Sequence, residues 1–193
     1  LPAMTSLLIW AALWEALGQS GVTIILPPLS AIFGRLGELL VNETFWNALA
    51  LTARTYLLGT GIAIVVGVPI GLLMGRVTVI DRLLLPWVNT FISAPLTALV
   101  PVIMALFGFG ETTIVLTVLL FAIWIIILDA RAGARAVSPS LVEMALVFGA
   151  TRLQTFTKIF ALAALPEILT GIRLGLIRAV KGVIIGQLLV SVV

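Results

Sequence analysis

The sequence predicts an all-α polytopic membrane protein, and three observations lead to that fold class. Of the 193 residues, 62% are hydrophobic and only 10% are charged, whereas soluble domains carry about 25% charged residues. The mean hydropathy is +1.29. The apolar residues lie in long runs separated by short polar or proline-containing stretches. Because a soluble core of this size could not cover so much apolar surface, we expect helices that cross a bilayer.

Two residue types that carry much of protein chemistry are absent. Without cysteine there is no disulfide framework and no thiolate metal site. Without histidine the chain lacks the commonest metal ligand and the usual general base. We therefore expect no catalytic residues and no metal site. The net charge of +3 does not indicate nucleic-acid binding, because basic residues of a membrane protein first report its orientation in the lipid bilayer.

The first apolar segment, residues 3–17, is interrupted by Glu15 and is short for a span of about 20 residues. It is therefore either a first membrane span or a peripheral helix. Leu1 is not a start methionine, and the C-terminal run GVIIGQLLVSVV ends inside apolar sequence. We expect that the start of the protein is missing from this sequence.

A proline pair at 27–28 separates this segment from an amphipathic one. After it, apolar residues recur at helical spacing, with Arg35 and Glu38 on another side. That pattern is typical of a helix lying at the membrane interface. We therefore divide the chain into residues 1–43, an N-terminal span plus an interfacial helix, and residues 44–193, the core.

The first core span is predicted between Arg54 and Arg76, because the residues between them carry no charge and are numerous enough to cross a bilayer. Pro69 is tolerated there as a kink. Small residues four apart permit close helix packing, and we expect the glycines of this span to serve packing. These glycines are Gly59, Gly61, Gly67, Gly71 and Gly75.

The second core span is predicted to be broken. The chain is uncharged from Leu83 to Gly110, but three prolines interrupt it: Pro86, Pro95 and Pro101. Irregular backbone at membrane depth is allowed only where it faces protein or a water-filled path. Polar residues of this stretch are therefore candidates for lining a translocation path, and the alternative is hydrogen bonding between helices. The candidates are Asn89, Thr90, Ser93 and Thr97.

The next span is predicted at residues 113–128. The charges on either side of the spans predict the orientation of the protein in the membrane. Basic residues gather in two loops on the same side of alternating spans: Arg76, Arg82, Arg131, Arg135, Arg152 and Lys158. The other side carries mainly acidic residues: Glu38, Glu43 and Glu111, with Arg35 as the exception. By the positive-inside rule, the loop 138–158 is cytoplasmic.

That loop contains signals for a short helix exposed to water, at about residues 139–148. Pro139 suits the first turn of a helix, and the Ser138 hydroxyl before it can cap free N–H groups. Glu143 lies near the start, where its charge opposes the positive end of the helix dipole. Gly149 follows where a helix commonly stops.

The stretch around this helix resembles the EAA loop of ABC importer permeases. The matching positions are Glu143, Ala145, Gly149, Ala150, Gln154, Phe156, Ile159, Pro166 and Gly171. Met144 departs from the pattern, since alanine is usual there, and Leu162 stands where many members have proline. The stretches LPPLSAIF and GVPIGLLMG also resemble segments of the nitrate, sulfonate and taurine branch of that family.

The resemblance implies a type I ABC importer transmembrane domain, of which about five of six spans are present and the last, C-terminal helix is missing from this sequence. It implies that the loop at residues 131–158 docks on a separate ATP-binding cassette ATPase, which would bind ATP and Mg while this chain holds no cofactor. The coupling residues would be Glu143, Ala145, Gly149, Ala150 and Gln154. The other implied partners are a second permease copy in a homodimer and an extracytoplasmic solute-binding protein, at the inner membrane of a bacterium.

The last apolar run carries three cations, Arg173, Arg178 and Lys181. At roughly 100° per residue they share one side of a helix. Cations inside a membrane usually face a bundle interior or a water-filled cavity, so these three are candidates for an electropositive path for an anionic substrate. The alternatives are snorkelling to the cytoplasmic interface and pairing with Glu167 or Asp129.

We therefore expect a permease subunit, not an enzyme, that moves a small solute such as an oxyanion or sulfonate from a binding protein into the cytoplasm. The chain has no G-x-x-x-x-G-K-[ST] loop with which to hydrolyse ATP itself. A secondary transporter or channel without an ATPase would also fit broken helices, but it gives no reason for the loop. A structural membrane subunit would tolerate polar substitutions along residues 89–97.

Overall fold

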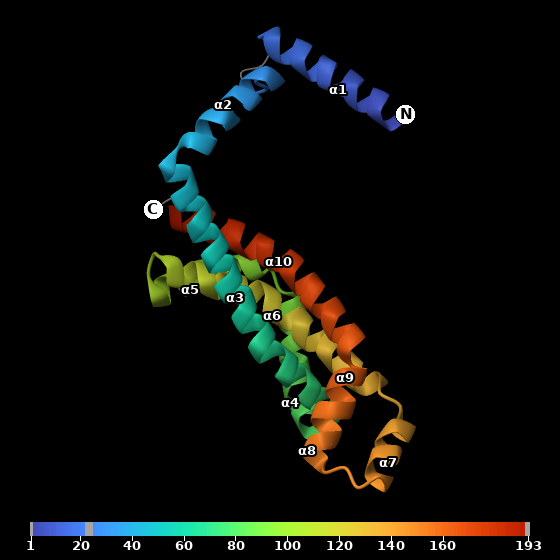
Figure 1. Cartoon of the computed structure of the whole chain (residues 1–193). Coiled ribbons are helices and arrows are strands. Elements are labelled where there is room, and N and C mark those ends of the chain that lie inside the picture. The colour runs from blue at the N-terminus through green and yellow to red at the C-terminus, as the bar shows by residue number, and fades with distance from the viewer. Residues whose placement is uncertain (1, 22–24, 192–193) are drawn as a thin grey trace. The chain divides into compact units, whose positions relative to one another are not determined.

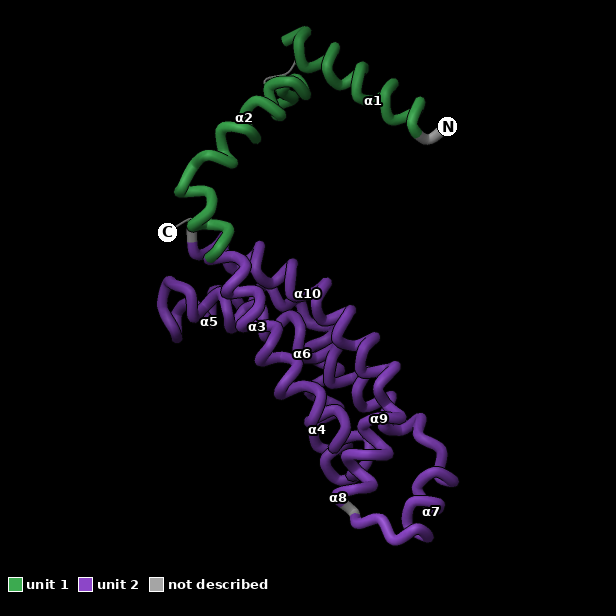
Figure 2. Tube along the Cα trace, viewed as in Figure 1, with its two compact units in different colours: residues 1–50 green, residues 51–193 purple. Residues whose placement is uncertain are grey.

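The computed structural model describes residues 2–21 and 25–191, and throughout these residues the elements are helices (Figure 1). The chain divides into two compact units, residues 1–50 and 51–193 (Figure 2). The all-α prediction is confirmed over this part of the chain. The proposed domain boundary after residue 43 stays a prediction.

The first unit contains α1 (Pro2–Gln19), α2 (Leu29–Val41) and the first turns of α3 (Glu43–Arg76). The carboxylate of Glu15 accepts hydrogen bonds from the backbone N–H of Ser30 (2.9 Å) and from its hydroxyl (2.6 Å). Ser30 lies in the first turn of α2, where N–H groups have no partner within the helix. Glu15, which interrupts the apolar pattern of α1, thus caps the next helix.

Within the described residues, two helices are long and apolar enough to cross a membrane, α3 and α6 (Glu111–Ala136). Two pairs of shorter helices are bent, and each pair also qualifies if it is one span. The first pair is α4 (Thr78–Ser93) followed by η1 (Leu96–Leu99) and α5 (Val100–Phe107), with a bend of 99°. The second pair is residues 155–163 followed by α10 (Leu165–Ser191), with a bend of 62°.

The described residues therefore provide two spans, or up to four with the bent pairs. The first bend is the predicted broken span, because it falls between Ser93 and Leu96, where Pro95 interrupts the helix. The expected five spans stay a prediction, since α1 is not among the helices that qualify.

The second unit is built around α6, with α3 and α10 running along it (Figure 1). The three helices share an apolar core: Ala63, Ile114, Val118, Ala122, Ile126, Ala179 and Val183. Glycine permits their close approach, since a Cβ atom at Gly71 would lie 2.4 Å from the carbonyl oxygen of Ile127. Four of the five predicted packing glycines face α6 in this way, whereas Gly61 faces open space.

The loop after α6 holds α7 (Pro139–Val147), α8 (Arg152–Gln154), the π-helical turn η2 (Thr155–Phe160) and α9 (Ala161–Ala163). The chain then enters α10. Since α5 precedes α6 and α7 follows it, the two lie at opposite ends of this 26-residue helix (Figure 1).

Candidate functional site

The helix α7 forms where the sequence predicts it, and it ends one residue earlier, at Val147. Pro139 occupies the first turn as expected. The prediction that Ser138 caps the helix is wrong, because its hydroxyl lies 2.7 Å from the Ser140 hydroxyl and bonds no backbone N–H. The dipole role expected of Glu143 is also wrong, since this residue lies beyond the first turn, where the effect has decayed.

The C-terminus of α7 is closed by a Schellman motif centred on Gly149. The N–H of Ala150 donates to the carbonyl of Ala145 at 2.9 Å, and the N–H of Gly149 donates to the carbonyl of Leu146 at 3.0 Å. Gly149 has a φ of 79°, the left-handed conformation that this motif requires. This Schellman motif thus contains three of the predicted coupling residues, Ala145, Gly149 and Ala150.

The fourth, Gln154, is the third residue of α8 and bonds the residue that precedes this helix. Its side-chain oxygen accepts from the N–H of Thr151 at 2.8 Å, and its own N–H donates to the Thr151 hydroxyl at 3.3 Å. This reciprocal arrangement is a capping box. The T-x-x-Q spacing that signals it is readable in the sequence, although our sequence analysis did not identify it.

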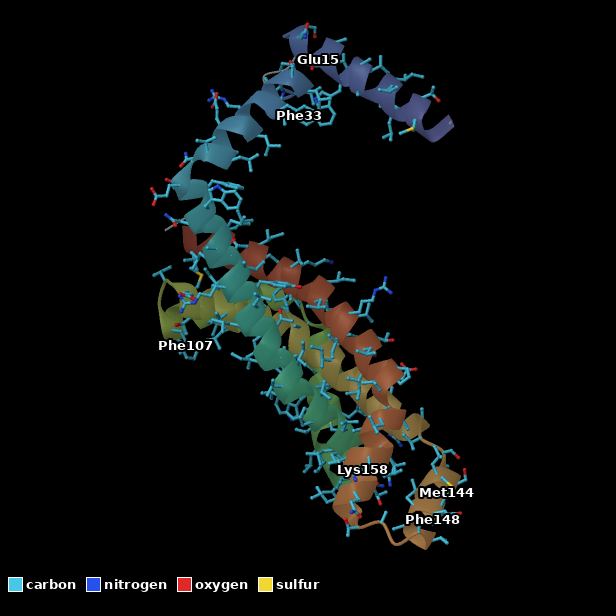
Figure 3. The ribbon with its side chains drawn as sticks, viewed as in Figure 1. Glu15, Phe33, Phe107, Met144, Phe148 and Lys158 are labelled. Carbon is cyan, nitrogen blue, oxygen red and sulfur yellow. The ribbon has the colours of Figure 1, made fainter. Side chains whose placement is uncertain are left out.

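These four residues also line one groove of about 470 Å³. Met144 of α7 and Phe148, the residue directly after α7, border the groove on one side, and Lys158 borders it from η2 (Figure 3). Glu143 is not among the lining residues, and its side chain is exposed. The structure thus brings four of the five predicted coupling residues together and leaves Glu143 on the surface of the same helix.

The tip of the loop is strongly apolar, which our sequence analysis missed. Val147 and Phe148 are each 84% exposed. Other exposed apolar residues lie beside them: Met144, Leu146 and Leu153. Apolar side chains gathered at a loop between predicted spans mark a surface that another molecule covers. The signal available in the sequence was the Leu-Val-Phe run directly before Gly149.

The candidate path residues of the broken span lie on exposed surface. Asn89 and Ser93 are four residues apart on one face of α4, whereas Val88 is buried on the face toward α6. Thr97 is exposed beyond the bend, in η1. None of these three polar residues bonds another described helix, and Thr90 donates within α4 to the carbonyl of Pro86 at 2.8 Å.

Two cations of the last helix, Arg173 and Lys181, are exposed and face away from α6, which contacts the glycines of α10. Arg178 is half-buried on the side nearer these glycines, where its charge acts on Asp129 of α6. The ion pairs described in the structure include none of these three cations, so the alternative of direct pairing with Glu167 or Asp129 is not formed there. Lys181 lies 16 residues after the first residue of α10, which is about 24 Å along the helix axis.

The structure does not bring the exposed polar face of α4 together with the exposed polar face of α10. Asn89 and Ser93 belong to α4, whereas Arg173 and Lys181 belong to α10, and each face is exposed in the single chain. The arrangement offers a docking surface at α7 and two polar helix faces. The orientation argument also used Arg152, whose side chain lies outside the described part of the structure.

Residues 67–192 match the family described as "Binding-protein-dependent transport system inner membrane component". The taurine transport system permease protein TauC of Escherichia coli is 32% identical over 152 residues, covering 79% of this chain and 54% of TauC. The putative aliphatic sulfonates transport permease protein SsuC of Bacillus subtilis is 31% identical over 186 residues, covering 93% of this chain and 66% of SsuC.

The formylaminopyrimidine transport permease protein ThiX of Halalkalibacterium halodurans is 27% identical over 176 residues, covering 91% of this chain and 70% of ThiX. The chain thus spans about half the length of TauC and about two thirds of SsuC and ThiX.

Proposed function

The chain belongs to the family of binding-protein-dependent transport system inner membrane components, and we propose that it is the membrane-spanning permease subunit of an ATP-driven importer. In this proposal a separate ATP-binding cassette ATPase docks on α7 in the cytoplasm. That subunit binds ATP and Mg, and this chain supplies the passage through the membrane. A second copy of the chain and an extracytoplasmic solute-binding protein complete the importer.

One observation carries the docking proposal. The helix α7 ends in two apolar side chains, Val147 and Phe148, that are 84% exposed, beside a groove lined by Ala145, Gly149 and Gln154. Both ends of the short connection to α8 are fixed, one by the Schellman motif and the other by the capping box. A helix held this firmly, with an apolar tip, suits a docking element that transmits movement.

The same architecture supports a path for a small anion. The exposed faces with Asn89 and Ser93 on α4, and with Arg173 and Lys181 on α10, are too polar to lie against lipid. TauC and SsuC are described as permeases for taurine and aliphatic sulfonates, whose sulfonate group is anionic. We therefore propose a sulfonate or a similar organic anion as the substrate.

The docking proposal is tested by co-purifying the full-length protein in mild detergent with the ATP-binding subunit encoded beside it. We expect a stable complex whose ATP hydrolysis rises when the substrate-loaded binding protein is added. A Val147→Ser/Phe148→Ser variant should bind the ATPase at least about tenfold more weakly, because burial of a Val or Phe side chain contributes about 1.5–3 kcal/mol and each 1.4 kcal/mol is about tenfold in Kd.

The matched control is Leu106→Ser. Leu106 is 74% exposed in α5, at the opposite end of α6 from the docking surface, so this variant should bind the ATPase normally. If the wild-type protein retains no ATPase and still carries out uptake, the importer proposal fails. A secondary transporter, which the two bent helix pairs would also suit, then becomes the leading hypothesis.

Lys181→Met is expected to raise the KM for sulfonate uptake about fivefold to tenfold, because it removes a cation from the proposed anion path. Lys181→Arg keeps the charge and should stay within about twofold of wild type. Uptake is measured in membrane vesicles at equal permease abundance. An unchanged KM in Lys181→Met would show that the ammonium group reaches the interface instead.

A further inference from the structure

Asp81 ties the start of α4 to the end of α6. Its carboxylate accepts hydrogen bonds from Nε and Nη2 of Arg131, the latter at 2.8 Å, and from Nη1 of Arg135 at 3.0 Å. The Asp81 side chain is 12% exposed and that of Arg131 is 15% exposed, so the pair is largely shielded from water. Both arginines lie in the last turns of α6, which ends at Ala136, shortly before α7 begins.

A second contact reaches the other side of the loop. The guanidinium carbon of Arg76, the last residue of α3, lies 3.6 Å from the centre of the Phe160 ring, a cation–π arrangement. Phe160 is 4% exposed and ends η2, the segment that leads away from the loop. Arg76 also shares a cavity of about 440 Å³ with Val142 and Leu146 of α7.

Only Val77 separates α3 from α4, so Arg76 and Asp81 belong to one corner between these helices. We define this α3–α4 corner as residues 76–81. Asp81 bonds the end of α6, the segment that enters the loop. Arg76 contacts Phe160 at the end of η2, the segment that leaves the loop. From the corner, α4 runs on to the exposed polar face with Asn89 and Ser93, which lie about 12–18 Å from Asp81 along the helix axis.

The nature of these contacts favours a positioning role over a purely stabilising one. A largely buried ion pair adds little net stability, because removing two charges from water offsets their attraction. Its best-attested use is to fix the register of two elements. The π-helical turn that carries Phe160 is a rare conformation that occurs frequently at functional sites. Both contacts thus fix elements whose relative position matters for coupling.

We propose that the α3–α4 corner is the relay through which movement of the coupling loop reaches α4, with Asp81 and Arg76 as its positioning residues. This inference rests on the proposed function of α7 as the docking element. When the ATPase moves α7, the α3–α4 corner stays attached to the end of α6 and to η2. It thereby transmits the displacement of these two segments to α4. The polar face of α4 moves with it.

The test measures the ratio of substrate-stimulated to basal ATP hydrolysis in the assembled complex. Asp81→Asn is expected to lower this ratio at least fivefold, the lower range of typical coupling between sites, while basal hydrolysis and ATPase association stay at the wild-type level. The conservative variant Asp81→Glu should retain at least half of the ratio, because it keeps a carboxylate that can accept from both Arg131 and Arg135. A merely structural role would change abundance and basal hydrolysis together.

A second ion pair provides the matched control. Arg54 Nε lies 3.1 Å from Glu111 Oε1 and joins α3 to the start of α6, at the end away from the loop. Glu111→Gln should therefore leave the stimulation ratio unchanged. If the Asp81→Asn variant does not insert into the membrane, the Arg76→Gln variant is used for the test instead. Arg76 is exposed, so its replacement leaves no buried charge without a partner. That variant should lower the ratio at least twofold, and Arg76→Lys should retain it.

The outcomes separate the relay from the proposed function. A wild-type complex with normal stimulation, together with full stimulation in both Asp81→Asn and Arg76→Gln, overturns the relay and leaves the docking proposal intact. A loss of coupling in Asp81→Glu as large as that in Asp81→Asn also overturns it. Absence of any ATPase from the wild-type protein overturns the docking proposal itself.

Discussion

A Gly149→Leu variant is expected to reach the membrane in normal amounts and to lose at least nine tenths of its ATP-driven uptake. Gly149 has a φ of 79°, and a residue with a Cβ atom is destabilised there by about 1–2 kcal/mol. The space around it is open, so the effect is conformational and not a steric clash. Relief of the strain would break the bonds from Gly149 and Ala150 that close α7.

Loss of that closure would displace the apolar tip and distort the groove beside it, which is why the expected effect on uptake is large. Gly149→Asn is the matched control, since asparagine adopts the left-handed conformation far more readily than leucine. It should retain at least half of the wild-type uptake. The measurement is initial uptake in whole cells, normalised to permease abundance in the membrane. Normal uptake by Gly149→Leu would contradict the docking role of this loop.

Gly71→Ala is expected to destabilise the helical bundle by about 1–3 kcal/mol, the usual range for overpacking a core. The new methyl group would lie 2.4 Å from the carbonyl oxygen of Ile127 and 2.7 Å from the Cβ of Ala130. Neither atom can rotate away, so the backbone of α6 must shift. For a chain of this size, that loss corresponds to a fall in Tm of about 2–12 °C.

Gly61→Ala provides the control within the same helix. A Cβ atom at Gly61 would meet nothing within 4 Å, although the change in helix propensity is the same as at Gly71. Thermal unfolding of the two variants in one detergent compares packing directly. An equal Tm for both would mean that α3 and α6 do not approach as closely as the structure has them.

The features that sequence reasoning predicted are those whose signal lies within one segment. The apolar runs of α3 and α6, the bend at Pro95 and the bounds of α7 all depend on residues close together in the chain. Gly149 was predictable as a helix end for the same reason. The glycine contacts of α3 were predictable as a class, since small residues four apart signal packing, but only the structure separates Gly71 from Gly61.

The features that were missed depend on residues far apart in the chain. Glu15 caps α2 by bonding Ser30, and no pattern within α1 indicates that partner. The sequence pattern uses Arg131 only as a marker of orientation, whereas in the structure it forms an ion pair with Asp81, 50 positions earlier. Position in the chain predicts the side of the membrane for Arg131, but only the folded packing of α4 on α6 determines its partner.

The exposed apolar side chains at the end of α7 have a consequence for how the cell degrades copies of the protein that have not assembled. A newly made copy that has found no partner presents Val147 and Phe148 to water, each 84% exposed. Surfaces of this kind promote aggregation and are recognised by chaperones and proteases. Under the docking proposal, the exposed side chains would mark an unassembled subunit for removal and would be covered on assembly, so that the amount of this chain would follow the supply of the ATPase.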